Sequence, residues 1–272
     1  MRILVPVDFS NCSKIAFQYA VHLARQCKGE IILIHIVPDL GPTLGRQSTE
    51  HLLSEMLVQA EQDLKELIGY CVEDEQKTIS FQIVHGAAVY MGISPIIETD
   101  NIDLVVMGTK GASGINKMLF GSNTVDAINH TKVPIIVVPE ACEIGPVTKL
   151  LYASDFANIR DEVRFLVPIA KLIGAGIRVI NMPPRIYMEY VDTSRLVADL
   201  KVECDFNDIE IVLLRGDNVL DSLEAYSAAS RGELLTLFTH KSTFLEQIFR
   251  KSIARELVWH GRVPLLVINK IR

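Results

Sequence analysis

Short apolar runs alternate along the chain with longer segments whose apolar positions recur every three or four residues. The short runs, such as IILIHIV at 31–37, are rich in β-branched residues and predict strands. Segments 13–26, 49–70 and 90–101 each gather their apolar residues on one helical face, and Pro95 starts or kinks the third. The order β-α-β-α-β-α-β-α-β predicts a doubly wound parallel sheet with right-handed crossovers.

The same order of strands occurs twice. RILVPVDFS at 2–10 returns as KLLYASDFA at 149–157, and both end near an Asp-Phe pair. Three further pairs follow in the same order: 31–37 and 177–182, 81–86 and 209–216, 133–139 and 263–269. The pattern predicts an internal duplication with a boundary near 140–146, giving modules at 1–142 and 146–272.

The two halves differ in length at one place. Asp8 and Asp155 are 147 residues apart, whereas Gly86 and Gly216 are 130 apart, so the first half holds 17 extra residues before Gly86. The connection after the second strand is the natural place for them.

Composition narrows the functional classes. Hydrophobic residues make up 49% of the 272 residues and aromatic residues only 7%, which is typical of α/β proteins with a buried parallel sheet. The net charge of −6, with no basic stripe, argues against a nucleic-acid partner. Asp8 interrupts the apolar N-terminus, and no apolar run reaches the roughly 20 residues of a membrane span. We expect a cytoplasmic protein without a membrane partner.

The cysteines and histidines show no metal-binding pattern. The five cysteines are widely spaced and never form C-x-x-C, which predicts neither a zinc site nor a disulfide framework and fits a reducing compartment: Cys12, Cys27, Cys71, Cys142 and Cys204. We interpret Cys12 as an inert thiol and His35 as a core or strand-end residue, and leave open whether His85 lines a pocket.

Glycines cluster directly after the fourth apolar strand, in LVVMGTKGASGINKMLFGSNT at 104–124. Their density indicates unusual backbone conformations or the close approach of a ligand rather than a packing choice. Glycines 108 and 111 predict an anion-binding nest, with Lys110 and Lys117 as compensating charges. Gly121 opens a helix whose N-terminus offers unpaired N–H donors, together with hydroxyls such as that of Thr124. Two such donor clusters suit a polyphosphate.

Asp8 closes the first strand, and ligands of open α/β sheets bind beyond the carboxyl ends of the strands. If the first and fourth strands are neighbours, Asp8 and the glycine segment flank one crevice, in a flavodoxin-like order 2-1-3-4-5 or a close relative of it. Because a phosphate would repel Asp8, we expect its carboxylate to accept hydrogen bonds from a ribose or a base. The spacing of the glycines and serines does not match other known signatures. The P-loop pattern G-x-x-x-x-G-K-[ST] and the dinucleotide-binding pattern G-x-G-x-x-G are absent, and Ser113 does not lie in the hydrolase pattern G-x-S-x-G.

The spacing G-x2-G-x9-G-S, with the early aspartate, resembles the nucleotide-binding branch of the universal stress protein family. The resemblance covers two tandem modules and implies, for each, a five-stranded parallel sheet in the order 3-2-1-4-5 with helices on both faces. It implies ATP or a related adenine nucleotide, with or without Mg²⁺, as the ligand of the first module. The residues that would hold it are Pro6, Asp8, Ile36, Met107, Gly108, Gly111, Gly121, Ser122 and Asn123. Without the resemblance, Met107 is equally consistent with a core position.

The resemblance also implies that the fifth strands pair, here within one chain through 133–139 and 263–269. A homodimer of the whole chain stays open.

The second module departs from the glycine pattern. Phe238, Lys241 and Lys251 stand where the first module has Gly108, Gly111 and Gly121, while Ser252 and Asp155 retain the matching serine and aspartate. We expect this degenerate module to have lost nucleotide binding. The alternative is a different anion pocket built from His240, Lys241, Arg250 and Lys251.

Three functions follow from these patterns. The first is a stress-response sensor or regulator that binds an adenine nucleotide in its first module. The second is a slow ATPase or phosphotransferase, with Asp8 holding Mg²⁺ and Ser122 near the γ-phosphate. The third is an interaction protein whose glycine segment is empty. No catalytic residue or resident metal ligand is predicted, so we expect at most slow ATP hydrolysis.

Overall fold

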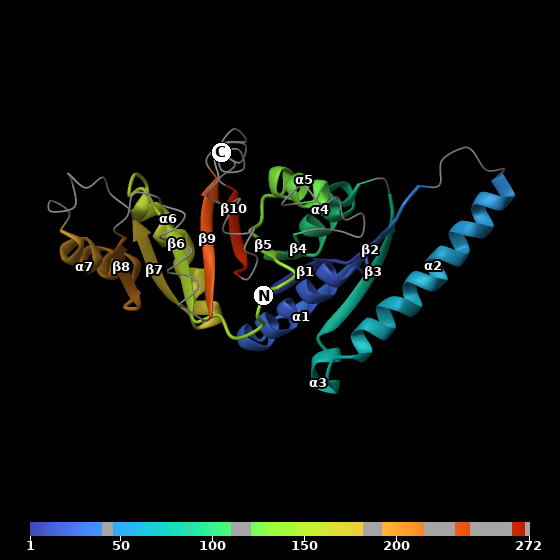
Figure 1. Ribbon diagram of the computed structural model, residues 1–272, viewed down its shortest axis with the longest axis horizontal. Helices are drawn as coiled ribbons and strands as arrows, with labels where there is room; N and C mark the ends of the chain where they lie inside the picture. The colour runs from blue at the N-terminus through green and yellow to red at the C-terminus, as the bar shows by residue number, and fades with distance from the viewer. Residues whose placement is uncertain are drawn as a thin grey trace. The chain divides into compact units, whose positions relative to one another are not determined.

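The computed structural model describes residues 1–39, 46–86, 88–109, 121–181, 192–214, 232–239 and 263–269 (Figure 1). The chain divides into two compact units, Met1–Glu140 and Ala141–Arg272. Each unit contains five described parallel strands.

The first unit has five described strands in the order β3-β2-β1-β4-β5, all parallel to their neighbours. The strands are β1 (Arg2–Pro6), β2 (Glu30–Val37), β3 (Ile79–His85), β4 (Leu104–Gly108) and β5 (Ile135–Val138). The described helices are α1 (Asn11–Cys27), α2 (Arg46–Gly69), α3 (Glu73–Gln76), α4 (Val89–Thr99) and α5 (Ser122–His130). Figure 1 shows α1 and α2 on one face of these strands and α4 with α5 on the other.

The second unit repeats this arrangement in the order β8-β7-β6-β9-β10, again with parallel neighbours. Its strands are β6 (Lys149–Ala153), β7 (Gly176–Asn181), β8 (Ile209–Leu213), β9 (Glu233–Thr239) and β10 (Leu265–Asn269). Its described helices are α6 (Ile159–Ile173) and α7 (Thr193–Cys204). Numbered within its own module, each sheet has the order 3-2-1-4-5, which confirms the fold class. The flavodoxin-like order itself is wrong, and its close relative is correct.

The predicted helices are present with small changes at their ends. The predicted segments 13–26, 49–70 and 90–101 correspond to α1, α2 and α4, and Pro95 lies inside α4. The N-cap of α1 is Ser10, whose Oγ accepts a hydrogen bond from the Ser13 amide at 3.3 Å. The short α3 was not predicted, because four polar residues carry no apolar periodicity.

Most of the length difference between the modules lies after the second strand, as expected. His35 and Asn181 hold the same position in β2 and β7 and are 146 residues apart, whereas the first residues of β3 and β8 are 130 apart. The first module fills this connection with the 24-residue α2 and with α3, where the second has the 12-residue α7.

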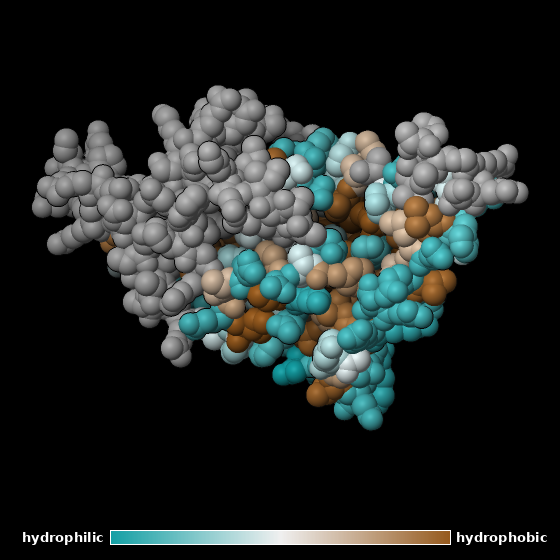
Figure 2. Space-filling model, turned by 45° about the vertical axis from the view of Figure 1, so that its right-hand side comes forward, coloured by the Kyte–Doolittle hydropathy of each residue, from teal (hydrophilic) through white to brown (hydrophobic). Residues whose placement is uncertain are grey.

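The charged segment 59–77 is largely exposed to solvent. Exposed charges on α2 include Glu61, Lys65 and Glu66, while Leu64 and Leu67 on the opposite side are buried. Figure 2 shows that hydrophilic residues dominate the described surface on this side of the molecule, with smaller hydrophobic areas between them. The core lies on both faces of the strands, with Leu64 and Leu67 on one side and Ile93 and Ile128 on the other.

Candidate functional site

Asp8 stands in a tight turn just beyond the carboxyl end of β1. Its Oδ1 accepts hydrogen bonds from the Ser10 amide at 3.1 Å and from the Ser10 hydroxyl at 2.6 Å. Phe9, between them, has a φ of 61°, a left-handed conformation that costs a non-glycine residue about 1–3 kcal/mol. Asp8 is exposed, and the two hydrogen bonds from Ser10 fix the direction of its carboxylate.

The turn sits beside the end of β4, as the sequence predicts. β1 pairs directly with β4, with Ile3 opposite Leu104 and Leu4 opposite Val105. Because parallel strands end at the same edge of a sheet, Asp8 and Thr109 share that edge.

Gly108 has a packing role that the sequence pattern does not predict. A Cβ atom there would lie 2.7 Å from Cys12 Sγ and 3.0 Å from the Cys12 carbonyl carbon and oxygen. The first turn of α1 therefore presses directly on the end of β4. The expectation that packing does not explain the glycines is wrong for Gly108, because helix-to-strand contact alone requires a residue without a side chain.

Cys12 is buried in that contact. Its Sγ lies 3.5 Å from Thr109 Oγ1 and 3.6 Å from the Val138 carbonyl oxygen. Its exposed fraction is 5%, which fits the interpretation of an inert thiol.

The N-terminus of α5 opens at the same place. The Gly121 amide donates to the Thr109 carbonyl at 2.7 Å, so the two ends of the intervening segment meet. Ser122 and Asn123 are exposed, and within the described ranges their backbone N–H groups have no backbone acceptor. Free amides at a helix N-terminus attract anions.

Thr124 does not join them. Its hydroxyl donates to the Gly108 carbonyl at 3.0 Å and is buried, so the prediction that it offers a donor to a ligand is wrong. The bond instead ties α5 to β4.

The remaining predicted residues occupy different settings. Met107 is buried in β4 opposite Val137, so its side chain belongs to the core. Ile36 packs close to Gly92 of α4, where a Cβ atom would lie 2.8 Å from Ile36 Cδ1. Pro6 ends β1 opposite Ile34. Gly111, Lys110 and Lys117 lie outside the described residues.

His85 lies at the end of β3, where its Nε2 is 2.9 Å from Asp39 Oδ1. This is a surface ion pair when His85 is protonated, and the side chain is 45% exposed.

The second unit keeps the aspartate turn and changes the end of its fourth strand. Asp155 Oδ1 accepts from the Ala157 amide at 2.9 Å, and Phe156 has a φ of 68°, matching Phe9. Phe238, at the position of Gly108, is 5% exposed. Its ring lies edge-on to Tyr152 of β6 and Phe165 of α6, with centroids 5.4 and 5.8 Å away.

Phe238 therefore packs against β6 and α6, where the first unit has a residue without a side chain. The substitution is a change of core packing. Lys241, Lys251, Ser252, Arg250 and His240 lie outside the described residues.

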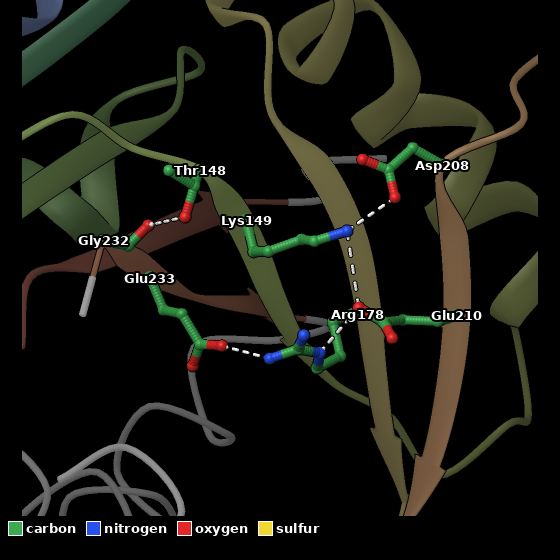
Figure 3. Close-up of polar contacts among 7 residues, drawn as sticks. All are labelled: Thr148, Lys149, Arg178, Asp208, Glu210, Gly232 and Glu233. Carbon is green, nitrogen blue, oxygen red and sulfur yellow. Dashed lines mark hydrogen bonds and ion pairs between the residues drawn. The ribbon is translucent and has the colours of Figure 1, made fainter. Parts of the chain in front are cut away.

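A charged cluster joins the amino ends of four strands in the second unit (Figure 3). Lys149 Nζ lies 2.5 Å from Asp208 Oδ1 and 3.4 Å from Glu210 Oε1. Arg178 donates through Nε to Glu210 at 2.8 Å and also pairs with the buried Glu233. Burial lowers the pKa of Lys149, but the hydrogen bond and charge of Asp208, followed by Glu210, outweigh it and leave that pKa raised.

This cluster lies at the opposite end of the sheet from the aspartate turn. The sequence pattern does not predict this cluster, because its members are spread over 85 positions, from 149 to 233, and each resembles an isolated surface charge. Gly176 leaves room for it, since a Cβ atom there would lie 2.5 Å from Lys149 Nζ.

No helix among the described residues is long and apolar enough to cross a membrane.

Comparisons with known proteins agree with this architecture. The chain is 28% identical over 139 residues to a universal stress protein of Methanocaldococcus jannaschii, a match that covers 50% of this chain and 81% of that protein. It is 23% identical over 148 residues to a universal stress protein of Bacillus subtilis, covering 50% and 97%.

A crystal structure of a universal stress protein from Archaeoglobus fulgidus is similar to nearly the whole chain. The TM-score is 0.69 at 17% identity, over 98% of this chain and 96% of that one, so the two share a fold. A family model described as the universal stress protein family matches residues 1–139, which is just over half of the chain. This protein therefore belongs to the universal stress protein family.

Proposed function

We propose that the first unit binds an adenine nucleotide (ATP, ADP or AMP) at the carboxyl ends of β1 and β4, and acts as a nucleotide-responsive sensor or regulator in the stress response. The observation that carries the proposal is the open N-terminus of α5 at the end of β4, on the edge of the sheet where Asp8 is held. One end of this edge offers a carboxylate, and the other offers backbone amides that have no backbone acceptor among the described residues.

The two ends suit the two ends of a nucleotide. The exposed Asp8 carboxylate accepts hydrogen bonds from ribose hydroxyls or a base amino group, while the Ser122 and Asn123 amides face anions such as phosphate oxygens. Pro6, Ile36, Met107, Gly108, Gly111 and Gly121 complete the proposed site.

In this arrangement Mg²⁺ would bind through the phosphates; only in the slow ATPase alternative would the Asp8 carboxylate hold Mg²⁺, with Ser122 near the γ-phosphate. Slow ATP hydrolysis is the alternative function, and a measurement of phosphate release tests it.

We propose a different role for the second unit. Its Asp155 turn is intact, but a buried aromatic ring replaces the glycine at the end of its fourth strand, so we expect structural or regulatory support rather than a second equivalent nucleotide site. The pairing of 133–139 with 263–269 and the dimerisation of the chain stay predictions.

Thermal unfolding with ATP, ADP, AMP and GTP, with and without Mg²⁺, tests the proposal. Ligand at 100 times its dissociation constant stabilises the binding unit by about 2.7 kcal/mol. For a unit of this size the midpoint rises by roughly 5–11 °C. The matched pair Asp8→Ala and Asp155→Ala removes the same turn from each unit, and we expect only Asp8→Ala to abolish the rise.

The other outcomes distinguish a site in the second unit, the absence of nucleotide binding, and slow ATP hydrolysis. A rise that Asp155→Ala removes and Asp8→Ala spares would move the site to the second unit. No rise with any nucleotide, after mass spectrometry has excluded a ligand retained through purification, would refute nucleotide binding and favour the interaction protein. Phosphate release under single-turnover conditions that Asp8→Ala abolishes would identify a slow ATPase.

A further inference from the structure

The two units hold the end of their first strand with the same bond from different side chains. In the first unit, His35 Nδ1 lies 2.8 Å from the carbonyl oxygen of Val7. In the second, Asn181 Nδ2 donates to the carbonyl of Ser154 at 2.7 Å. Val7 and Ser154 each immediately precede the aspartate of the turn.

The backbone around these bonds also matches. The Val7 amide donates to the Ile34 carbonyl at 2.8 Å, and the Ser154 amide donates to Ile180 at 2.9 Å. Both bonds lie one residue beyond the last paired positions of the strands. The backbone amide anchors one side of the residue before the aspartate, and the side chain from the second strand anchors its carbonyl.

Stereochemistry explains why histidine and asparagine are interchangeable here. A carbonyl oxygen only accepts, so His35 must carry its proton on Nδ1. His Nδ1 and Asn Nδ2 are both bonded to Cγ, so each donor lies the same number of bonds from the backbone. Leucine has the same branching as asparagine at Cγ but no donor.

The hydrogen bond between His35 and Val7 lies next to the strained residue Phe9. Phe9, two residues after Val7, has a φ of 61°, and its ring centroid lies 4.6 Å from that of His35. A left-handed Phe persists only where its surroundings hold it. His35 supplies two such contacts, one to the backbone before Asp8 and one to the ring after it.

We infer that His35 is a positioning residue for the nucleotide site: it holds the Val7–Phe9 backbone so that the Asp8 carboxylate points toward the ligand, and Asn181 holds Asp155 in the same way. This inference rests on the proposed function for its ligand but not for its geometry. His35 acts through Asp8.

His35→Asn and His35→Leu form the decisive pair, because the chain itself uses asparagine at the matching position. Two quantities are measured in the full-length protein: the dissociation constant for ATP, and amide hydrogen exchange across residues 8–10. We expect His35→Asn to keep the affinity of the original protein. We expect His35→Leu to weaken ATP binding by about three- to tenfold, the effect of losing one hydrogen bond.

Exchange distinguishes local positioning from general loss of stability. In His35→Leu the amides of residues 8–10 should exchange faster, while those of β4 and α5 stay unchanged. Asn181→Leu is the matched control: it should speed exchange at residues 155–157 and leave ATP affinity unaltered.

The outcomes separate this inference from the proposed function. If the original protein binds no ATP but His35→Leu still speeds exchange at residues 8–10, the proposed function fails and the positioning of the turn stands. If exchange in His35→Leu matches the original protein, or His35→Asn behaves like His35→Leu in both measurements, the inference is overturned.

Discussion

A Cβ atom on Gly108 would lie 2.7 Å from the Sγ atom of Cys12 and 3.0 Å from its carbonyl carbon. Real Cβ contacts with backbone atoms are rarely so short, so α1 must shift if residue 108 gains a side chain. We expect Gly108→Ala to destabilise the first unit by about 1–3 kcal/mol, as overpacked cores do. Urea unfolding measures the change.

Gly69→Ala provides the control within the same unit. Among the described residues, no neighbouring atom lies within 4 Å of a Cβ atom at Gly69, the last residue of α2. Alanine should be neutral there or stabilise the helix, by up to about 1 kcal/mol. A Gly108→Ala protein as stable as the original would show that Gly108 is kept for a reason other than the contact with Cys12.

Phe238 makes the opposite prediction in the second unit. Its ring is buried between Tyr152 and Phe165, so Phe238→Ala should leave a cavity and destabilise this unit by about 3–5 kcal/mol. Phe165→Ala is the comparison, because that side chain is 45% exposed and should lose less. Equal losses in urea unfolding would contradict a core role for Phe238.

The charged cluster of the second unit predicts an alkaline limit to its stability. Folding raises the pKa of Lys149 above its ordinary value of 10.5, through the hydrogen bond and charge of Asp208 against an opposing effect of burial. The stabilisation is therefore fully present below pH 10.5 and is lost as the pH rises through the raised pKa. Unfolding from pH 8 to 11 should show a steeper loss of stability in the original protein than in Lys149→Met.

Gly176→Ala offers a second variant of the same test. Its Cβ atom would meet Lys149 and Asp208, so these side chains must separate. The pH dependence should then resemble that of Lys149→Met. Identical slopes in all three proteins would exclude the cluster as the source.

Several features of the fold were predictable because their causes are local. The apolar faces of 13–26 and 49–70 predicted α1 and α2, and the repeated strand order predicted two similar sheets. The small α3 escaped prediction because its four residues hold no apolar position.

The candidate site was predictable in outline. Asp8 and the segment after Gly108 were expected at neighbouring strand ends, and β1 does pair with β4. The prediction that the Thr124 hydroxyl donates to a ligand was wrong. Its acceptor is the Gly108 carbonyl, 16 residues away, and the sequence alone does not show that the two groups meet.

Residue order alone specified the types of element, the duplication and the strand ends that carry Asp8 and the glycines, because helical and strand periodicities depend on neighbours along the chain. Folding decided that Gly108 accommodates Cys12, that Phe238 packs against Tyr152, and that His35 holds Val7. These contacts join residues 28 to 96 positions apart, so they depend on which strands become neighbours and how closely a helix packs on them.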